Sequence, residues 1–121
     1  MGVRNYRELV VWQKAMNFVT EIYRVSEQFP KEERFGLTSQ IRRAVVSIPT
    51  NISEGEGRQS RKEFAQFLAI AHGSLRETET LFEIALRLKF IPAGERLAFE
   101  EQASEIGRML NGLMRTVRES L

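Results

Sequence analysis

The 121-residue sequence contains no cysteine and no aspartate, and it has a single histidine. Without cysteine, neither a disulfide framework nor a thiolate metal site can form. The chain lacks the residues from which a catalytic triad is built. A di-iron site in a helix bundle is also excluded, because it requires paired Glu-x-x-His motifs. The only histidine is His72, and the residue three positions before it is Ala69. We therefore expect a non-enzymatic protein without a metal or cofactor, in which His72 is structural or exposed.

Long apolar runs are also missing. No stretch of about 18 apolar residues could form a membrane span, and charges interrupt the N-terminal "MGVRNYRELVVWQK" too early for a signal peptide. The stretch "EGEGR" at 54–58 contains two closely spaced glycines, but it lacks the Gly-Lys-Ser/Thr ending of a P-loop and follows a predicted helix rather than a strand. We expect a soluble cytoplasmic protein without a membrane association or a small-molecule substrate.

The charged residues that are present are of few types and unevenly placed. The chain has 14 Arg, 4 Lys and 16 Glu, and its formal net charge is +2. Glu and Arg are good helix formers, and Arg also binds phosphate or carboxylate in pairs of hydrogen bonds. Residues 34–62 carry six basic residues and two Glu, whereas residues 63–121 carry seven and nine. The basic excess therefore lies in residues 34–62, although a helix-rich surface alone also favours Arg.

Apolar periodicity predicts four amphipathic helices in one domain spanning 1–121, at about 6–29, 38–57, 61–89 and 94–119. Three short connectors predict an all-α, antiparallel up-down-up-down four-helix bundle, and nothing alternates with the period of a strand. The core-facing stripes expected for the four helices in turn are Leu9, Trp12, Met16, Val19, Ile22 and Tyr23; Ile41, Ala44, Val45, Ile48 and Ile52; Phe64, Phe67, Leu68, Ala71, Leu75, Thr78, Leu81, Phe82, Ala85 and Leu88; and Phe99, Ala103, Ile106, Leu110, Leu113 and Val117.

Pro49 lies inside the second predicted helix. Proline has no amide donor and clashes with the carbonyl four residues before it, at a cost of about 3 kcal/mol. Either the helix stops near Ser47, or it bends and the hydroxyls of Ser47 and Thr50 help to satisfy the freed groups. Because Ile48 and Ile52 keep the apolar stripe in phase across the proline, we favour a bent, continuous helix.

Two local signals occur in the third predicted helix. Ser60 followed by Glu63 forms a capping box, which predicts that the helix begins here. Gly73 lies well inside the helix, where we expect it to be a point of close packing between helices rather than a hinge.

Three stretches carry a family resemblance. "RFGLTSQIRRAVVSIPTNISEGEGR" at 34–58 resembles the signature of a small bacterial four-helix bundle family first met as proteins encoded within intervening sequences of large-subunit ribosomal RNA genes. "LVVWQKA" at 9–15 resembles the family's opening, and "KEFAQFLAIAHGSLRETETLFEIA" at 62–85 resembles its third helix. The resemblance covers about residues 6–91, and the last predicted helix matches only in character.

The resemblance implies a fold and an assembly. Members are antiparallel four-helix bundles, similar to the accessory variability proteins of diversity-generating retroelements. Those proteins assemble as a ring of five bundles with a basic surface, and they partner a reverse transcriptase and its template RNA. For this chain the resemblance therefore implies a homo-oligomer, namely a pentamer, with RNA and a reverse transcriptase as partners.

A candidate phosphate-binding surface lies around the junction of the second and third predicted helices. Arg42 and Arg43 are adjacent, so their side chains diverge by about 100° on a helix. At most one of them can therefore share a face with Arg58 and the start of the third predicted helix. The alternative is a solvated surface neutralised by the nearby glutamates, and no named RNA-reading motif is present. The basic residues expected to contact phosphate are Arg42, Arg43, Arg58, Arg61 and Lys62.

Two sets of residues are candidates for a subunit interface. A polar stripe on the second helix, formed by Gln40, Arg43, Ser47, Asn51 and Glu54, could fix the register of a partner or simply face solvent. The first helix has more apolar residues than one narrow stripe needs, including Val11, Trp12 and Phe18, and surplus apolar surface marks partner contacts unless the core-facing stripe is wide. We expect Trp12, Gln40, Ser47 and Asn51 to lie in an oligomer interface.

The sequence thus favours a homo-oligomeric bundle that binds RNA, or a nucleoprotein partner such as a reverse transcriptase, through its basic surface. The alternative is a protein–protein scaffold without a nucleic-acid role.

Overall fold

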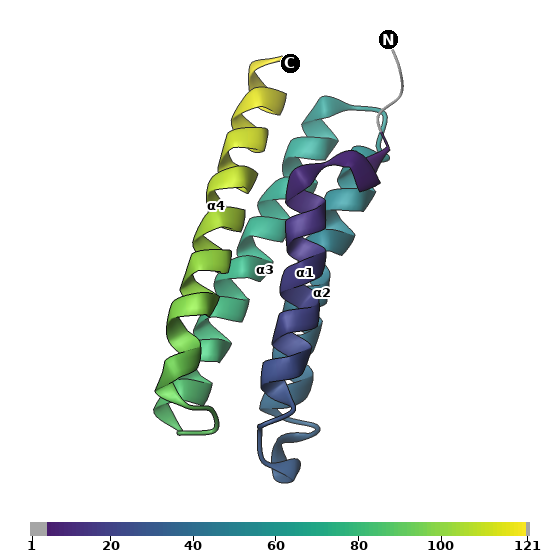
Figure 1. The fold of residues 1–121 in the computed structure, drawn as a ribbon. Helices are drawn as coiled ribbons and strands as arrows, with labels where there is room; N and C mark the ends of the chain where they lie inside the picture. The colour runs from purple at the N-terminus through teal and green to yellow at the C-terminus, as the bar shows by residue number, and fades with distance from the viewer. Residues whose placement is uncertain (1–4, 121) are drawn as a thin grey trace.

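The computed structural model describes residues 5–120, which fold into four antiparallel α-helices (Figure 1). The α-helices are α1 (Val10–Ser26), α2 (Leu37–Glu56), α3 (Arg61–Arg87) and α4 (Arg96–Glu119). Short 3-10 turns precede three of them: η1 (Tyr6–Glu8), η2 (Lys31–Glu33) and η3 (Ala93–Glu95). No strand occurs between residues 5 and 120, so the predicted all-α, up-down-up-down four-helix bundle is confirmed. None of these helices is both long and apolar enough to cross a lipid bilayer.

The first helix differs most from its prediction. Leu9 has an extended backbone, which separates η1 from α1, and α1 ends at Ser26 instead of residue 29. The predicted stripe is right for buried Ile22 and wrong for Met16 and Tyr23, which are 39% and 40% exposed. Its other members, Leu9, Trp12 and Val19, are half-buried against the core. The buried face is Val11, Ala15, Phe18, Ile22 and Val25. Apolar residues cover a wide arc of α1, and packing against the other helices decides which part of that arc is buried.

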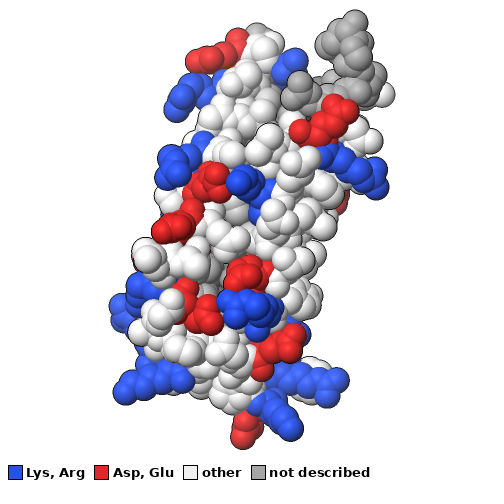
Figure 2. Space-filling model, viewed as in Figure 1, with Lys and Arg blue, Asp and Glu red and all other residues white. Residues whose placement is uncertain are grey.

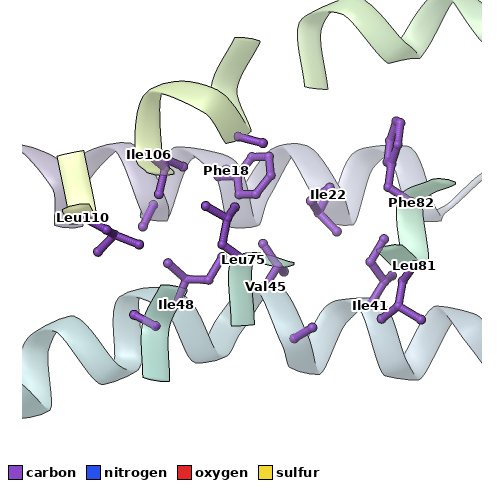
Figure 3. Packing of buried hydrophobic residues seen from close by; sticks show 14 of the residues in the cluster. Phe18, Ile22, Ile41, Val45, Ile48, Leu75, Leu81, Phe82, Ile106 and Leu110 are labelled. Carbon is purple, nitrogen blue, oxygen red and sulfur yellow. The ribbon is translucent and has the colours of Figure 1, made fainter. Parts of the chain in front are cut away.

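The remaining stripes are closer to prediction. All five stripe residues of α2 are buried, and so are those of α4 except for half-buried Leu113. On α3, Phe64 and Phe67 are half-buried and Leu88 is 56% exposed, so its place in the core was wrongly predicted. Charged side chains are spread over the outer face in Figure 2, whereas apolar side chains of all four helices meet in Figure 3. Stacked rings of Phe82 and Phe99, 3.7 Å apart, join α3 to α4.

Helix α2 runs without interruption through Pro49, so the continuous helix favoured from the sequence is confirmed, and the bend stays a prediction. Pro49 is buried, and the Thr50 hydroxyl donates to the carbonyl of Val46 at 2.8 Å, not to the carbonyl of Val45 that the proline leaves without its amide donor. The expected role of Ser47 was wrong. Its hydroxyl oxygen instead accepts hydrogen bonds from Asn51 and from Ser74 on α3, each at 2.8 Å.

The closest approach between α2 and α3 occurs at a glycine, but not at the one expected. A β-carbon at Gly55 would lie 2.7 Å from the β-carbon of Phe67 and 3.0 Å from a ring carbon of Phe64. A β-carbon at Gly73 would meet nothing within 4 Å, because Gly73 faces outwards. The prediction for Gly73 was therefore wrong, and Gly55 is the residue that lets the two helices meet.

The end of α3 is closed by a Schellman motif. The amide of Phe90 donates to the carbonyl of Ala85 at 2.9 Å, and the amide of Lys89 donates to the carbonyl of Leu86 at 3.0 Å. Lys89 occupies the left-handed position of this motif with φ of 62°, where glycine is the usual residue.

The two loops at this end of the bundle are joined to each other. The rings of Phe29 and Phe90 lie 5.9 Å apart, and Arg24 of α1 forms an ion pair with Glu95 at 3.0 Å. The hydrogen bond from Arg24 holds the pKa of the Glu95 carboxyl below its usual value. These contacts fix where α4 begins relative to α1.

We expect Lys89→Gly to stabilise the protein by about 0.5–1 kcal/mol, because a left-handed backbone is strained for lysine and free for glycine. The free energy of unfolding in urea measures the change. Gln66→Gly, at an exposed position inside α3, is the control and should lose about 1 kcal/mol. Equal losses in both variants would contradict the strain at Lys89.

Gly55→Ala should cost about 1–3 kcal/mol, because the added methyl group forces α2 away from α3. The matched control is Gly112→Ala inside α4, where an added β-carbon meets nothing within 4 Å. That control should gain about 0.5–1 kcal/mol from its better helix propensity. The helix packing described here would be wrong if thermal unfolding showed both variants to be stabilised.

Candidate nucleic-acid interface

The five basic residues expected to contact phosphate do not form one surface. Arg58 follows the end of α2, and Arg61 and Lys62 begin α3, so these three gather at one corner of the bundle. Arg43 lies in the second turn of α2, and a rise of ~1.5 Å per residue puts it roughly 20 Å from Arg58 along the axis. We call Arg58, Arg61 and Lys62 the corner patch.

Arg42 is held between α1 and α2. Its Nε donates to the Ser26 hydroxyl at 2.8 Å, and its Nη2 donates to the Tyr23 carbonyl at 3.3 Å. The guanidinium carbon also lies 4.5 Å from the centre of the Tyr23 ring. Tyr23 and Ser26 belong to the last turn of α1, where the helix dipole favours a positive charge. Arg42 thus joins two helices, a role that its sequence position did not suggest.

The corner patch is open to solvent. The Arg58 guanidinium lies 4.9 Å from the centre of the Phe67 ring and 3.7 Å from the Glu54 carboxylate. This ion pair is half-exposed, and such pairs contribute little free energy. Arg61 and Lys62 are exposed and form no ion pair with any residue between 5 and 120. The Ser60 hydroxyl accepts a hydrogen bond from the Glu63 amide at 2.9 Å, so the predicted helix start at this corner is confirmed.

Positive charge is balanced on the face formed by α1 and α4. Figure 2 shows Lys and Arg side chains next to Glu side chains over that face. Lys14 lies 3.5 Å from Glu105, and Arg24 pairs with both Glu21 and Glu95. This face therefore presents a mixture of charges, whereas at the corner patch only Arg58 is paired with a carboxylate among the described residues.

Two of the expected interface residues bond within the chain. Ser47 accepts a hydrogen bond from Ser74, and the side chain of Asn51 donates to the Ser47 carbonyl and hydroxyl oxygens. Both residues are half-buried along the line where α2 meets α3. Gln40 is exposed and Trp12 is half-buried.

An open apolar groove runs between α1 and α2. It consists of two adjoining hollows of about 590 and 330 Å³, both lined by Val46 and Thr50. Of the surplus apolar residues predicted on the first helix, Trp12 lines this groove, whereas Val11 and Phe18 are buried in the core. We call this hollow the α1–α2 groove, and its main apolar lining is Trp12, Met16, Val19, Tyr23 and Val46.

His72 is half-buried, and its Nε2 atom has no hydrogen-bond partner among the described residues. Between residues 5 and 120, no three His, Cys, Asp or Glu side chains are grouped so that they could hold a metal ion.

Comparison with known proteins confirms the resemblance to the intervening-sequence protein family. The profile of the family described as 23S rRNA-intervening sequence protein matches residues 7–112, which extends into α4. The fold is similar to the 1.70 Å crystal structure of a protein with unknown function from the S23 ribosomal protein family from Bacteroides thetaiotaomicron VPI-5482. That similarity has a TM-score of 0.80 at 30% sequence identity, and it covers 88% of this chain and 96% of the other. No curated protein matches the chain.

We expect Arg42→Ala to destabilise the bundle by about 1.5–3 kcal/mol, because it removes charged hydrogen bonds at the end of α1. Arg61→Ala, which changes the same residue type in the corner patch, should stay within about 0.5 kcal/mol of the parent protein. Urea unfolding followed by circular dichroism compares the two variants. Equal stabilities would contradict the structural role of Arg42.

Proposed function

Because the chain belongs to the 23S rRNA-intervening sequence protein family, we propose that it is a non-enzymatic, homo-oligomeric bundle that binds RNA through the corner patch. The RNA can be free or part of a nucleoprotein complex, such as one with a reverse transcriptase. A ring of five subunits is the assembly that the sequence resemblance suggests.

The observation that supports RNA binding is the corner patch itself. Three cationic side chains lie within five positions of the sequence, and Arg61 and Lys62 have no carboxylate partner among the described residues. Lys and Arg that neutralise phosphates release condensed counterions, which favours binding at low salt. One patch of three cations binds weakly, but an oligomer repeats the patch in every subunit and so multiplies the attraction.

Binding of this kind is directed at the RNA backbone. The aromatic residues beside the corner patch, Phe64 and Phe67, are half-buried, and they form no row of exposed rings on which bases could stack. Contacts to phosphates fix position and orientation but carry no sequence information. We therefore propose recognition of RNA shape and charge rather than of base sequence.

The second candidate is a protein–protein scaffold without a nucleic-acid role, and the α1–α2 groove is the observation that favours it. Salt separates the two functions. Phosphate binding weakens steeply as the salt concentration rises, whereas apolar contacts do not.

Reversing the corner patch with Arg58→Glu, Arg61→Glu and Lys62→Glu should abolish most RNA binding. Each lost phosphate contact reduces the slope of log K against log salt by about 0.7–0.9, so the slope should fall by about 2–3. Fluorescence anisotropy with a structured RNA between 50 and 200 mM salt measures both quantities.

A matched triple variant separates the corner patch from the total charge. Lys31→Glu, Arg34→Glu and Lys89→Glu change exposed residues in the two loops at the other end of the bundle by the same charge. This control should keep most of the binding and most of the salt slope. Equal losses in both triple variants would reject the corner patch as the binding site, and RNA binding by neither variant nor parent would favour the scaffold.

A further inference from the structure

The outer surface of α3 carries apolar residues that the described chain leaves partly exposed. Ile70 is 52% exposed and Ile84 is 40% exposed. Together with Glu77 they recur every seven residues, which places them on one stripe of the helix. Glu77 is exposed and forms no ion pair within residues 5–120. We call Ile70, Gly73, Glu77 and Ile84 the α3 ridge.

Gly73 is the most unusual residue of the α3 ridge. Glycine weakens the interior of a helix, and here its missing side chain makes room for nothing inside the bundle, because an added β-carbon would meet no atom within 4 Å. Gly55 shows what such a residue does in this fold when another helix packs against it. A backbone left bare on the surface in the same way permits equally close contact with a second molecule.

The α3 ridge and the α1–α2 groove are on adjacent sides of the bundle. Ser74 follows Gly73 and bonds to Ser47 of α2, so the ridge lies on the side of α3 that borders α2. The groove lies mainly on the other side of α2, towards α1, and only its larger hollow extends around α2 as far as Ser47. In a four-helix bundle, neighbouring sides face directions about a quarter turn apart.

The relative heights of the two surfaces follow from contacts within the chain. The Ser47–Ser74 bond and the Gly55–Phe67 contact fix the antiparallel register of α2 and α3. Each step along α2 therefore corresponds to one step back along α3. Glu77 consequently stands level with Arg43, Gly73 with the stretch 46–49, and Ile70 with the stretch 50–53, each within about two residues or roughly 3 Å.

We propose that the α1–α2 groove of one subunit receives the α3 ridge of a second copy of this chain. In a ring whose axis is parallel to the bundles, all copies stand at the same height, so the levels just described apply between neighbours. Gly73 then faces Val46, which is 39% exposed, and Ile70 enters the part of the groove beside Trp12. Glu77 meets Arg43, which lines the groove and has no ion-pair partner in the described chain.

Charge and length both favour a second copy as the occupant. Glu77, the one acidic residue of the ridge, lies level with Arg43, the unpaired arginine of the groove. From Ile70 to Ile84 the ridge covers 14 residue steps, which is about 21 Å on a helix. The α2 residues that line the groove run from Ser39 to Ser53 and span the same length. Because the two surfaces differ and face directions about a quarter turn apart, the contact is head-to-tail and closes into a small ring rather than a two-fold dimer.

The inference rests on the self-association in the proposed function, and it adds which surfaces meet. The test is the mass of the Gly73→Leu variant, measured by light scattering without RNA. The new leucine side chain has open space within one subunit, but it would block the approach of Val46 from the neighbouring subunit. Against a parent mass of several 14.0-kDa subunits, we expect this variant to dissociate at concentrations at least about tenfold higher, with helical content unchanged. Gly112→Leu adds the same side chain in open space on α4 and should keep the parent mass.

A charge swap tests the pairing of Glu77 with Arg43. Glu77→Arg and Arg43→Glu should each weaken assembly, and the double variant should recover a large part of the parent mass, because the pair is restored in reverse. An oligomeric Gly73→Leu variant with the parent mass would overturn the inference and leave the proposed function intact. A parent protein of 14.0 kDa at all concentrations would overturn both the inference and the self-association, while the anisotropy assay still judges RNA binding separately.

Discussion

The close packing of α2 against α3 is the constraint on which the other features depend. The two helices approach closely because Gly55 of α2 has no side chain to separate it from Phe67 of α3. The hydrogen bond between the hydroxyls of Ser47 and Ser74 fixes their register about halfway along. A polar pair of this kind adds little free energy but disfavours a shifted alignment, in which the Ser74 hydroxyl would lose its bond to Ser47. This register determines where the corner patch lies and at what height the α3 ridge stands beside the groove.

The remaining helices are positioned around that pair by a few specific contacts. Arg42 fastens the end of α1 to α2, and Arg24 and Phe29 connect α1 to the loop before α4. Because Arg42 is used in this way, the basic excess of residues 34–62 is divided between structure and surface. The corner patch holds the part that is available to a phosphate, and Arg43 is left beside the groove.

RNA binding and assembly would then use separate parts of the same helices. The corner patch lies at the junction of α2 and α3, whereas the groove and the ridge lie along their lengths. A head-to-tail ring built on these surfaces repeats the patch at one end of every bundle, since all subunits point the same way. Weak electrostatic contacts would be added together without a deep pocket or a specific base contact.

Apolar periodicity and connector length determined the fold class, the number of helices and the core stripes of α2 and α4, because these helices have one narrow apolar face each. Ser60 located the start of α3, and the stripe around Ile48 and Ile52 correctly favoured a helix continuing through Pro49. These are local properties, which a short stretch of sequence contains in full.

Only the tertiary structure decided which part of α1 is buried, which glycine permits close packing and which arginines remain free. Val11 and Trp12 are neighbours of similar character, and the helices opposite them place one in the core and leave the other in the groove. Positions 55 and 73 are both glycine, yet only Gly55 has another helix packed against it. Arg42 and Arg43 differ by one position, and a turn of about 100° brings only Arg42 to the end of α1. In each case the outcome depends on residues distant in the sequence, whose positions no local pattern contains.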